Sequence, residues 1–433
     1  MDFFEAVEKW EKVIDAYYIS GGFYNKSYLQ KFPRETDEKF RDRKSIATLE
    51  VGIAKDVNRY IGYLFKKLPT RETGGSEIAL EIMLDADRRG NSIDVFMQNF
   101  AVNAKLRGVG LVLVDMPIDI PSNYKNQIEQ RALPFFQFIP PEKIIEYELN
   151  EKGGFKRIKW EEEYEPVGGI YTSPQTIWKE FDEMGWRIYQ PETDKPIKEG
   201  THGLGECPVL IFSEDGGFPT IGEFTEIGEL AVKHFNLTSQ LDDILRQQTF
   251  PLLTINTDVI SGVEIAISTN NALKYGKGFE RPGFIAPPPA PAEILQNRIQ
   301  RIEDKIKDIT YNIETNRSQE SGIALELKFQ GLNSSLSKFA NKLEDFEIRM
   351  WEMAFKYIKL VSPVKVNYEK DFSISDPLKE IEVLKEVDLL TDSPTYKKQK
   401  TLQILKNTLS SVTQESWAEI EREVTESIKV EKE

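Results

Sequence analysis

The sequence has almost no cysteine and almost no histidine. Among its 433 residues are one cysteine, Cys207, and two histidines, His202 and His234. One thiol cannot close a disulfide within the chain, and so few thiols and imidazoles leave the usual zinc and copper ligand sets incomplete. We therefore expect a protein of a reducing compartment, with no cofactor and no metal site.

An excess of positive charge is also missing. The chain carries 56 Lys and Arg against 71 Asp and Glu, a net charge of −15 at pH 7. Affinity for phosphates comes from clustered Lys and Arg, so this balance argues against a protein that coats nucleic acid. No apolar run approaches the ~20 residues of a membrane span, and the charged first residues do not resemble a signal peptide. We expect a soluble intracellular protein with no membrane partner.

Common signatures of catalysis are absent as well. The sequence holds no Gly-x-x-x-x-Gly-Lys-Ser/Thr phosphate loop and no Gly-x-Ser-x-Gly turn. Gly108-Val-Gly110 precedes an apolar strand rather than following one, which favours a tight helix-to-strand turn over a nucleotide site. Catalysis by two carboxylates stays open, because 71 acidic residues allow many pairs.

The chain does have ample material for a core, with 40% hydrophobic and 11% aromatic residues. This content excludes disorder over most of its length. The N-terminal part has helical spacing: apolar residues recur every three or four positions over 46–64, and Pro69 ends that helix. Further helices are expected over 76–88 and over 92–106, the second capped by Asn91 or Ser92.

A β-rich region follows. Residues 109–115 form a continuous apolar run with branched side chains, which predicts a buried strand stopped by Pro117. From 133 to 212, polar and apolar residues roughly alternate in short segments, typical of an antiparallel sheet with one solvated face. Segments 176–181 and 186–189 flank the turn of a predicted hairpin.

Three long helical patterns dominate the rest of the chain, over 220–248, 292–313 and 324–360. Their apolar residues alternate at spacings of three and four, which indicates helices packed side by side. A strand is expected over 364–368, and short amphipathic helices are expected over 371–433.

The segments between the long helices differ in character. Residues 250–291 contain strand-like stretches at 252–256 and 283–286 and end in a stiff, proline-rich run. Residues 314–322 are mostly small and polar, as in a loop. A long helix pair that holds a β-rich tip away from the main body suits a ring of subunits better than a monomeric enzyme.

Individual polar residues favour structural roles. Asp115 ends a buried strand just before a proline, so a turn or capping role is favoured over catalysis. Residues 161–163 are three glutamates that would suit a hard cation, but a solvated strand end is the commoner case. Asp242 and Asp243 lie on the polar side of a helix, and His234 lies on an apolar side, where a packed histidine is expected.

Several blocks of the sequence, taken in order, resemble the portal proteins of tailed bacteriophages, in a portal-like branch of unknown function. The first block is 39–69, which begins with an Arg-rich stretch. The second is 93–117, which reads as a helix, a glycine turn and a strand ending in Val-Asp-Met-Pro. The third is 207–256. The last has a Pro-led strand, a long helix with Asn236 and Asp242, and a Phe-Pro-Leu strand. Ser321-Gly-Ile-Ala324 resembles the family's small-residue start to the helix after the loop.

The resemblance implies an α+β portal fold: a mixed α/β wing, long stem helices, a small α/β clip and a helical C-terminal crown. The implied parts are the wing (1–218 and 324–370), the stem helices (219–249 and 292–313), the clip (250–291), the channel loop (314–323) and the crown (371–433).

The implied function is that of a structural conduit and not of an enzyme. A ring of about twelve copies would sit at one capsid vertex of the virion, after assembly in the host cytoplasm, and pass double-stranded DNA during packaging and ejection. The implied partners are other copies of the chain, the terminase large subunit, the major capsid and scaffold proteins and the head-to-tail connector.

The resemblance also implies site residues, none of them catalytic. The channel loop would present Glu314, Thr315, Asn316, Arg317, Ser318, Gln319, Glu320 and Ser321 to DNA. Arg317 is the favoured phosphate-facing cation, with pairing to Glu320 or to a neighbouring subunit as the rival role. The clip would meet the motor and the connector through Phe250, Asn256, Lys274, Lys277, Pro282 and Pro287.

Two other interpretations stay open. One is an α/β enzyme with a helical oligomerisation arm and a site near Asp115 and the β region. The other is a helical scaffold or adaptor, which would lack the sheet. An enzyme needs a concave pocket with converging polar groups, whereas a portal needs an open ring.

Overall fold

A computed structural model describes the chain as two compact units, Met1–Lys370 and Asp371–Glu433. Helices combine with antiparallel sheets, which confirms the predicted α+β class. The residues that the structure describes are 1–117, 130–164, 175–191, 193, 195–249, 252–254, 283–285, 288–312, 322–372, 393–408, 417 and 420–425.

The first unit begins with helices α1 (Phe3–Tyr18), α2 (Gly21–Tyr24), α3 (Asp37–Ile46) and α4 (Ile53–Leu64). The prediction of one helix over 46–64 is wrong at its start, because residues 47–52 are not helical and Gly52 stands at the N-cap of α4. Leu49 is buried all the same, so a core residue of a non-helical segment happened to match the helical spacing.

The next helices are α5 (Glu77–Leu84) and α6 (Ile93–Arg107). The hydroxyls of Ser76 and Ser92 each accept a hydrogen bond from a backbone N–H of the first turn, which satisfies donors that have no partner within the helix. α5 is shorter than predicted, because the carboxylates of Asp85 and Asp87 accept hydrogen bonds from the backbone N–H groups of residues 89–91 and hold a turn there.

Two antiparallel sheets follow. The first has the order β3 (Phe135–Ile139), β2 (Val109–Asp115), β9 (Val209–Ser213). The second runs in chain order through β4 (Ile144–Leu149), β5 (Phe155–Tyr164), β6 (Gln175–Asp182), β7 (Gly185–Tyr189) and β8 (Lys198–Thr201). β2 is the predicted buried strand and β6–β7 the predicted hairpin, and both are confirmed. β8 is an addition: its Lys-Glu-Gly-Thr sequence has no apolar alternation, as is common for short edge strands.

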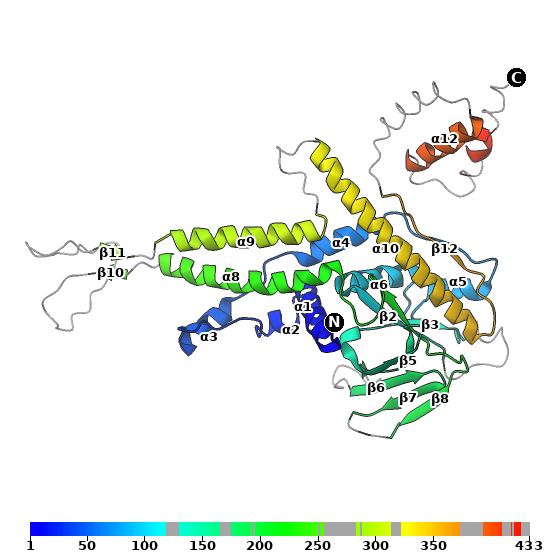
Figure 1. The fold of residues 1–433 in the computed structure, drawn as a ribbon, viewed down its shortest axis with the longest axis horizontal. Coiled ribbons are helices and arrows are strands. Elements are labelled where there is room, and N and C mark those ends of the chain that lie inside the picture. The colour runs from blue at the N-terminus through cyan, green and yellow to red at the C-terminus, as the bar shows by residue number, and fades with distance from the viewer. Residues whose placement is uncertain are drawn as a thin grey trace, which may run out of the picture. The chain divides into compact units, whose positions relative to one another are not determined.

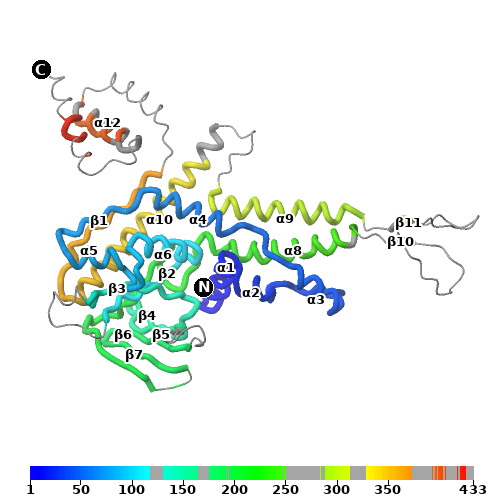
Figure 2. Tube along the Cα trace, turned by 180° about the vertical axis from the view of Figure 1, so that it is seen from behind, coloured from blue at the N-terminus to red at the C-terminus, as the bar shows by residue number. Residues whose placement is uncertain are grey.

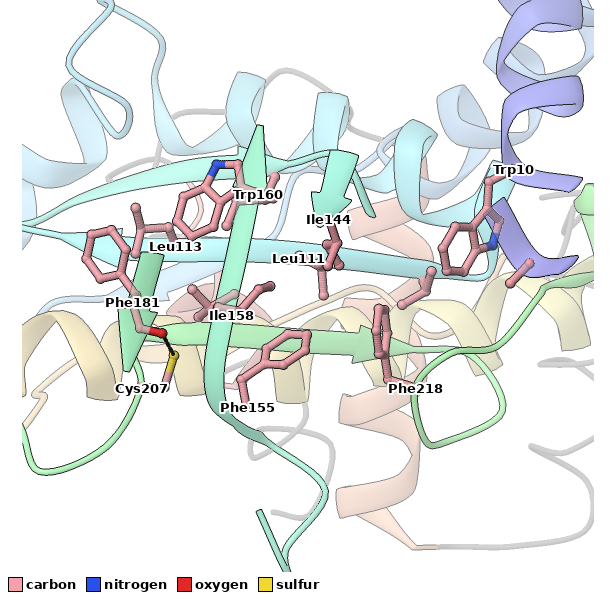
Figure 3. Close-up of a cluster of buried hydrophobic side chains, with 14 residues drawn as sticks. Trp10, Leu111, Leu113, Ile144, Phe155, Ile158, Trp160, Phe181, Cys207 and Phe218 are labelled. Carbon is pink, nitrogen blue, oxygen red and sulfur yellow. Dashed lines mark hydrogen bonds between the residues drawn. The ribbon is translucent and has the colours of Figure 1, made fainter. Parts of the chain in front are cut away.

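A cluster of buried side chains joins α1 to both sheets (Figure 3). Trp10 of α1, Phe155 and Trp160 of β5 and Phe218 are all buried there. Cys207 belongs to the same cluster, with its Sγ 3.7 Å from the Phe181 carbonyl oxygen, and burial raises the pKa of this thiol to about 12. Cys207 is therefore a core residue.

The long helices are α8 (Glu226–Thr249), α9 (Ala290–Ile309) and α10 (Gly322–Tyr357). α8 starts later than predicted because a 3₁₀ turn, η2 (Glu223–Thr225), precedes it, and α9 ends earlier because Tyr311 turns to a positive φ of 52°. α8 and α9 lie side by side, and in both views they extend away from the sheets (Figures 1 and 2).

Two short strands close the first unit. β1 (Thr70–Glu72), which was not predicted as a strand, pairs antiparallel with β12 (Lys365–Asn367), the predicted strand after α10. A segment that precedes α8 and α9 in the sequence thus pairs with a segment that follows α10. In the second unit, the structure describes helix α12 (Pro394–Thr408), one of the short helices expected there.

Gly222 lies where two backbones cross, between β9 and η2. Its N–H donates to the Arg107 carbonyl, and a Cβ built on it would lie 2.5 Å from the Cα of Gly108. Gly222→Ala should therefore lower the free energy of unfolding by about 1–3 kcal/mol, the usual cost of forcing extra atoms into a packed site. Urea unfolding measures this change.

The matched control for that prediction is Gly62→Ala in α4, where a Cβ would meet nothing within 4 Å. Alanine is the better helix former, so this variant should be neutral or slightly stabilised. Equal destabilisation of the two variants would contradict the backbone-crossing argument.

Candidate functional site

The candidate site is the helix pair α8–α9 together with the segments at its two ends. α9 buries Ile302 and Ile306 as it packs along α8, as the spacing of isoleucines predicts. His234 of α8 is 1% exposed, and its Nε2 lies 3.2 Å from the carboxylate of Glu303 on α9. The prediction that His234 is a packed histidine is confirmed. Its contact with Glu303 sets the register between α8 and α9.

The N-terminal helices brace α8 along its length. The Asn236 side chain donates to the Tyr28 carbonyl (2.9 Å) and accepts from the Gln30 N–H (2.8 Å), so it holds the segment between α2 and α3 against α8. Lys39 of α3 lies 3.8 Å from Asp243, which places this acid in an ion pair on the helix surface. Asn236, one of the residues that carry the resemblance, therefore has a structural role here.

Arg43 of α3 is a second residue that holds the N-terminal helices against α8. It had been noted in the sequence only as part of the Arg-rich start of the block 39–69. It is 2% exposed, pairs with Glu35 (2.7 Å) and donates to the hydroxyl of Ser239 on α8 (3.2 Å). The hydrogen bond from this guanidinium lowers the pKa of the Glu35 carboxyl. Arg43 also lies over the Phe32 ring, 4.3 Å from its centroid, an arrangement that stabilises a buried cation.

Two short strands stand at the far end of the helix pair. β10 (Leu252–Thr254) and β11 (Gly283–Ile285) pair antiparallel, with Leu252 opposite Ile285. Both were predicted as strands; their pairing was not. The Gln248 side chain donates to the Pro288 carbonyl (3.2 Å) and links the ends of α8 and α9. The predicted clip residues Phe250, Asn256, Lys274, Lys277, Pro282 and Pro287 lie outside the described residues.

At the other end, the exit of α9 is clamped to α4 and η2. The Tyr311 hydroxyl donates to Glu223 of η2 (2.8 Å), and burial, together with this hydrogen bond, raises the pKa of Tyr311. The Asn312 amide donates to Asp56 of α4 (2.9 Å) and accepts from Arg59. Sequence reasoning missed these residues, because nothing in the local pattern around Tyr311 and Asn312 pairs them with helix α4.

A buried charge cluster lies behind this clamp. Lys105 of α6 is 3% exposed and contacts both Glu214 (3.2 Å) and Glu223 (3.4 Å). Its ammonium also faces the ring of Phe224 at 4.7 Å. Burial raises the pKa of Glu214, and the charge of Lys105 opposes that rise. The exit of α9 is therefore connected through Glu223 to the core of the first unit.

The predicted channel-loop residues begin just after this clamp. Glu314, Thr315, Asn316, Arg317, Ser318, Gln319, Glu320 and Ser321 all lie outside the described residues. The structure describes the chain up to Asn312 on one side of them and from Gly322, the first residue of α10, on the other.

Asp115, the residue singled out by the enzyme interpretation, stabilises the turn that follows β2. Its carboxylate accepts a hydrogen bond from the N–H of Met116 (2.8 Å) at the end of β2. Burial raises the pKa of Asp115, and burial also raises that of nearby Tyr357, with the Asp115 charge contributing. His202 accepts from the Leu204 N–H and contacts the Asp182 carbonyl, so its ring nitrogens are engaged locally.

Two of the three glutamates of β5 pair with lysines. Glu161 contacts Lys143 (3.1 Å) and Glu162 contacts Lys179 (2.9 Å), which agrees with a solvated strand end. Within the described ranges, no group of three or more acidic, histidine or cysteine side chains could hold a metal ion. Nor does any helix in those ranges combine the length and the apolar character needed to cross a membrane.

No protein-family model matches the chain, and no curated protein matches it. Solved structures of gene transfer agent (GTA) particles are similar over most of its length. A chain in the neck of an empty GTA particle, computed with C6 symmetry, is 10% identical with a TM-score of 0.49; the match covers 81% of this chain and 90% of that chain.

Two further GTA structures are similar in the same way. For the virion of a native GTA particle the identity is 10% and the TM-score 0.47, over 88% of this chain and 96% of that chain. For the neck of a native GTA particle computed with C12 symmetry, the identity is 8% and the TM-score is 0.42. That match covers 90% of this chain and 98% of that chain.

Proposed function

We propose that this chain is a portal protein: a non-enzymatic subunit that closes into a ring at a capsid vertex and forms a channel for double-stranded DNA. One observation carries the proposal. The antiparallel pair α8–α9 leaves the sheets, bears the β10–β11 tip and returns to the same unit through α10 and β12. An insertion built in this way suits a stem that lines a channel, with a tip presented for docking.

The proposed parts follow the helices and strands. The wing comprises residues 1–218 and 324–370, the stem is α8 and α9, the clip spans 250–291, and the crown spans 371–433. The clip would dock the packaging motor and, after packaging, the head-to-tail connector, while the wing would meet the capsid and scaffold proteins.

The charge of the chain supports a conduit for DNA of any sequence. Each phosphate contact by Lys or Arg displaces a counterion, and a translocating duplex would have to reverse that gain at every step. A strongly cationic channel would therefore hold DNA in place. A chain with a net charge of −15 avoids this.

Single-particle electron microscopy of the purified protein at low salt tests the proposal. A ring of twelve 49.8-kDa chains, about 600 kDa, with a central hole is the expected particle. A compact monomer or dimer, both alone and with scaffold protein added, would overturn the proposal.

Arg317→Ala tests the proposed channel loop. The loop 314–322 carries one arginine against two glutamates, so removing the arginine removes its only cation. Rings should assemble as in the wild type, while the rate of DNA packaging in an in vitro packaging reaction should change. Asn316→Ala is the uncharged control. Loss of rings in Arg317→Ala would assign this arginine to subunit pairing instead.

A further inference from the structure

A groove of about 460 Å³ lies where α1, α4 and α6 come together. Figure 2 shows α4 and α6 close together in the first unit, and α1 contacts both. Tyr17 and Tyr18 line the groove from α1, Asn58 and Gly62 from α4, and Gln98 and Asn99 from α6. The Tyr17 hydroxyl donates to the Asn58 side chain (2.7 Å) and ties α1 to α4 at the groove.

The lining of the groove is uncharged. None of its residues is Asp, Glu, Lys or Arg, although such residues make up 29% of the chain. Amides and tyrosines offer hydrogen bonds and flat apolar surface, which suit a protein surface. Tyr18, which lines the groove, is 58% exposed, and the residues next in sequence to lining residues, Ile19 and Tyr63, are 53% and 38% exposed.

Within the part of the chain that the structure describes, nothing requires a glycine at position 62. It lies inside α4, where glycine costs about 1 kcal/mol relative to alanine. A Cβ built on it would meet nothing within 4 Å, and no positive φ requires glycine there. The missing side chain keeps the groove open, which is useful if another molecule docks there.

We infer that this groove is a docking site for a second copy of the chain, one contact of a head-to-tail interface. The inference rests on the proposed ring and adds a location to it. Two copies with a net charge of −15 each repel one another, so their contact is favoured at a neutral patch. In a heterologous interface, a concave patch on one subunit receives a different, protruding patch of the next.

A matched pair of variants at Gly62 tests this docking site. Gly62→Leu fills the groove, and Gly62→Ala leaves most of it open; both should fold, because each improves helix propensity. The ring fraction seen by electron microscopy should fall by about tenfold or more in Gly62→Leu, since an overpacked contact weakens association, and should be unchanged in Gly62→Ala. Circular dichroism melting confirms folding. Rings that persist in Gly62→Leu would overturn the inference and leave the portal proposal standing.

A cross-linking experiment decides the inference even if the chain forms no ring. A photo-cross-linking benzoylphenylalanine replaces Tyr18, the exposed tyrosine that lines the groove, and the exposed Met184 in a control. A covalent product of twice the 49.8-kDa chain mass with the Tyr18 probe, well above the Met184 control, would support docking between copies. Absence of that product would overturn it. A dimer product from a protein that never forms rings would support the groove and contradict the portal.

Discussion

Replacing Glu347 with alanine should lower the free energy of unfolding by about 3–5 kcal/mol. Glu347 of α10 is fully buried and pairs with Arg71 of β1, whose side chain is 1% exposed. It also accepts hydrogen bonds from the Tyr368 hydroxyl (2.6 Å) and the Trp351 indole N–H (3.1 Å). Removing the carboxylate would leave the buried guanidinium with Asp94 as its remaining ionic partner among the residues that the structure describes.

The position of this pair explains why the loss should affect the whole first unit. Arg71 precedes the α8–α9 insertion, and Glu347 and Tyr368 follow it. The ion pair and the β1–β12 pairing therefore close the unit around the insertion. A variant that breaks the ion pair therefore loosens the contact between the segment before the proposed stem and the segment after it.

Chemical denaturation followed by circular dichroism measures the effect. The control is Glu72→Ala, one residue from Arg71, whose partner Lys365 lies 3.9 Å away with both side chains about four-fifths exposed. Exposed pairs contribute little, so this variant should unfold almost as the wild type does. A Glu347→Ala protein as stable as Glu72→Ala would show that the buried pair does not hold the unit closed.

Trp10→Ala should have a similarly large effect, a loss of about 3–5 kcal/mol. Trp10 is fully buried in the cluster beneath α1 and packs near Phe3 and Phe218. Its indole N–H donates to two carbonyls, those of Arg107 at the end of α6 and Thr220 ahead of α8, each at 3.1 Å. Alanine would leave a cavity and remove the donor from both carbonyls.

Trp10→Phe separates the two contributions. It keeps much of the ring volume and removes only the N–H. Because the Arg107 carbonyl still accepts from the Gly222 N–H, the loss should be smaller, about 0.5–1.5 kcal/mol for the lost hydrogen bonds. Urea unfolding midpoints of the two variants give the comparison. Equal losses would mean that the hydrogen bonds, and not the packing, account for the stability at this junction.

Much of the fold follows from local patterns. Apolar spacing predicted α8, α9 and α10, since a helix repeats within a few residues and its buried face is marked in the sequence. Ser76, Ser92 and Gly108 marked helix ends for a similarly local reason, because caps act on groups within one turn. The errors fell where local spacing was fortuitous, as at Leu49, or where a turn shortened a helix, as after Leu84.

The candidate site was predictable only in outline. Apolar spacing predicted the two helices, and strand-like composition predicted the two tip strands. Their roles as stem and clip, and that of the channel loop, were implied by the resemblance and stay predictions. The clamp at Tyr311 and Asn312 and the groove at Gly62 gave no sign in the sequence. Their partners come from other helices, and Asp56 is 256 residues from Asn312.

The sequence by itself determined the α+β class, the long helices, the buried strand β2 and the acidic, cysteine-poor character of the chain. Only the tertiary structure decided which buried charges pair, which backbones cross at Gly222 and where a neutral groove opens. The physical reason is separation along the chain. The periodicity of a helix or strand depends on residues that are close in the sequence. Arg71 and Glu347 are 276 residues apart and come into contact only in the folded protein.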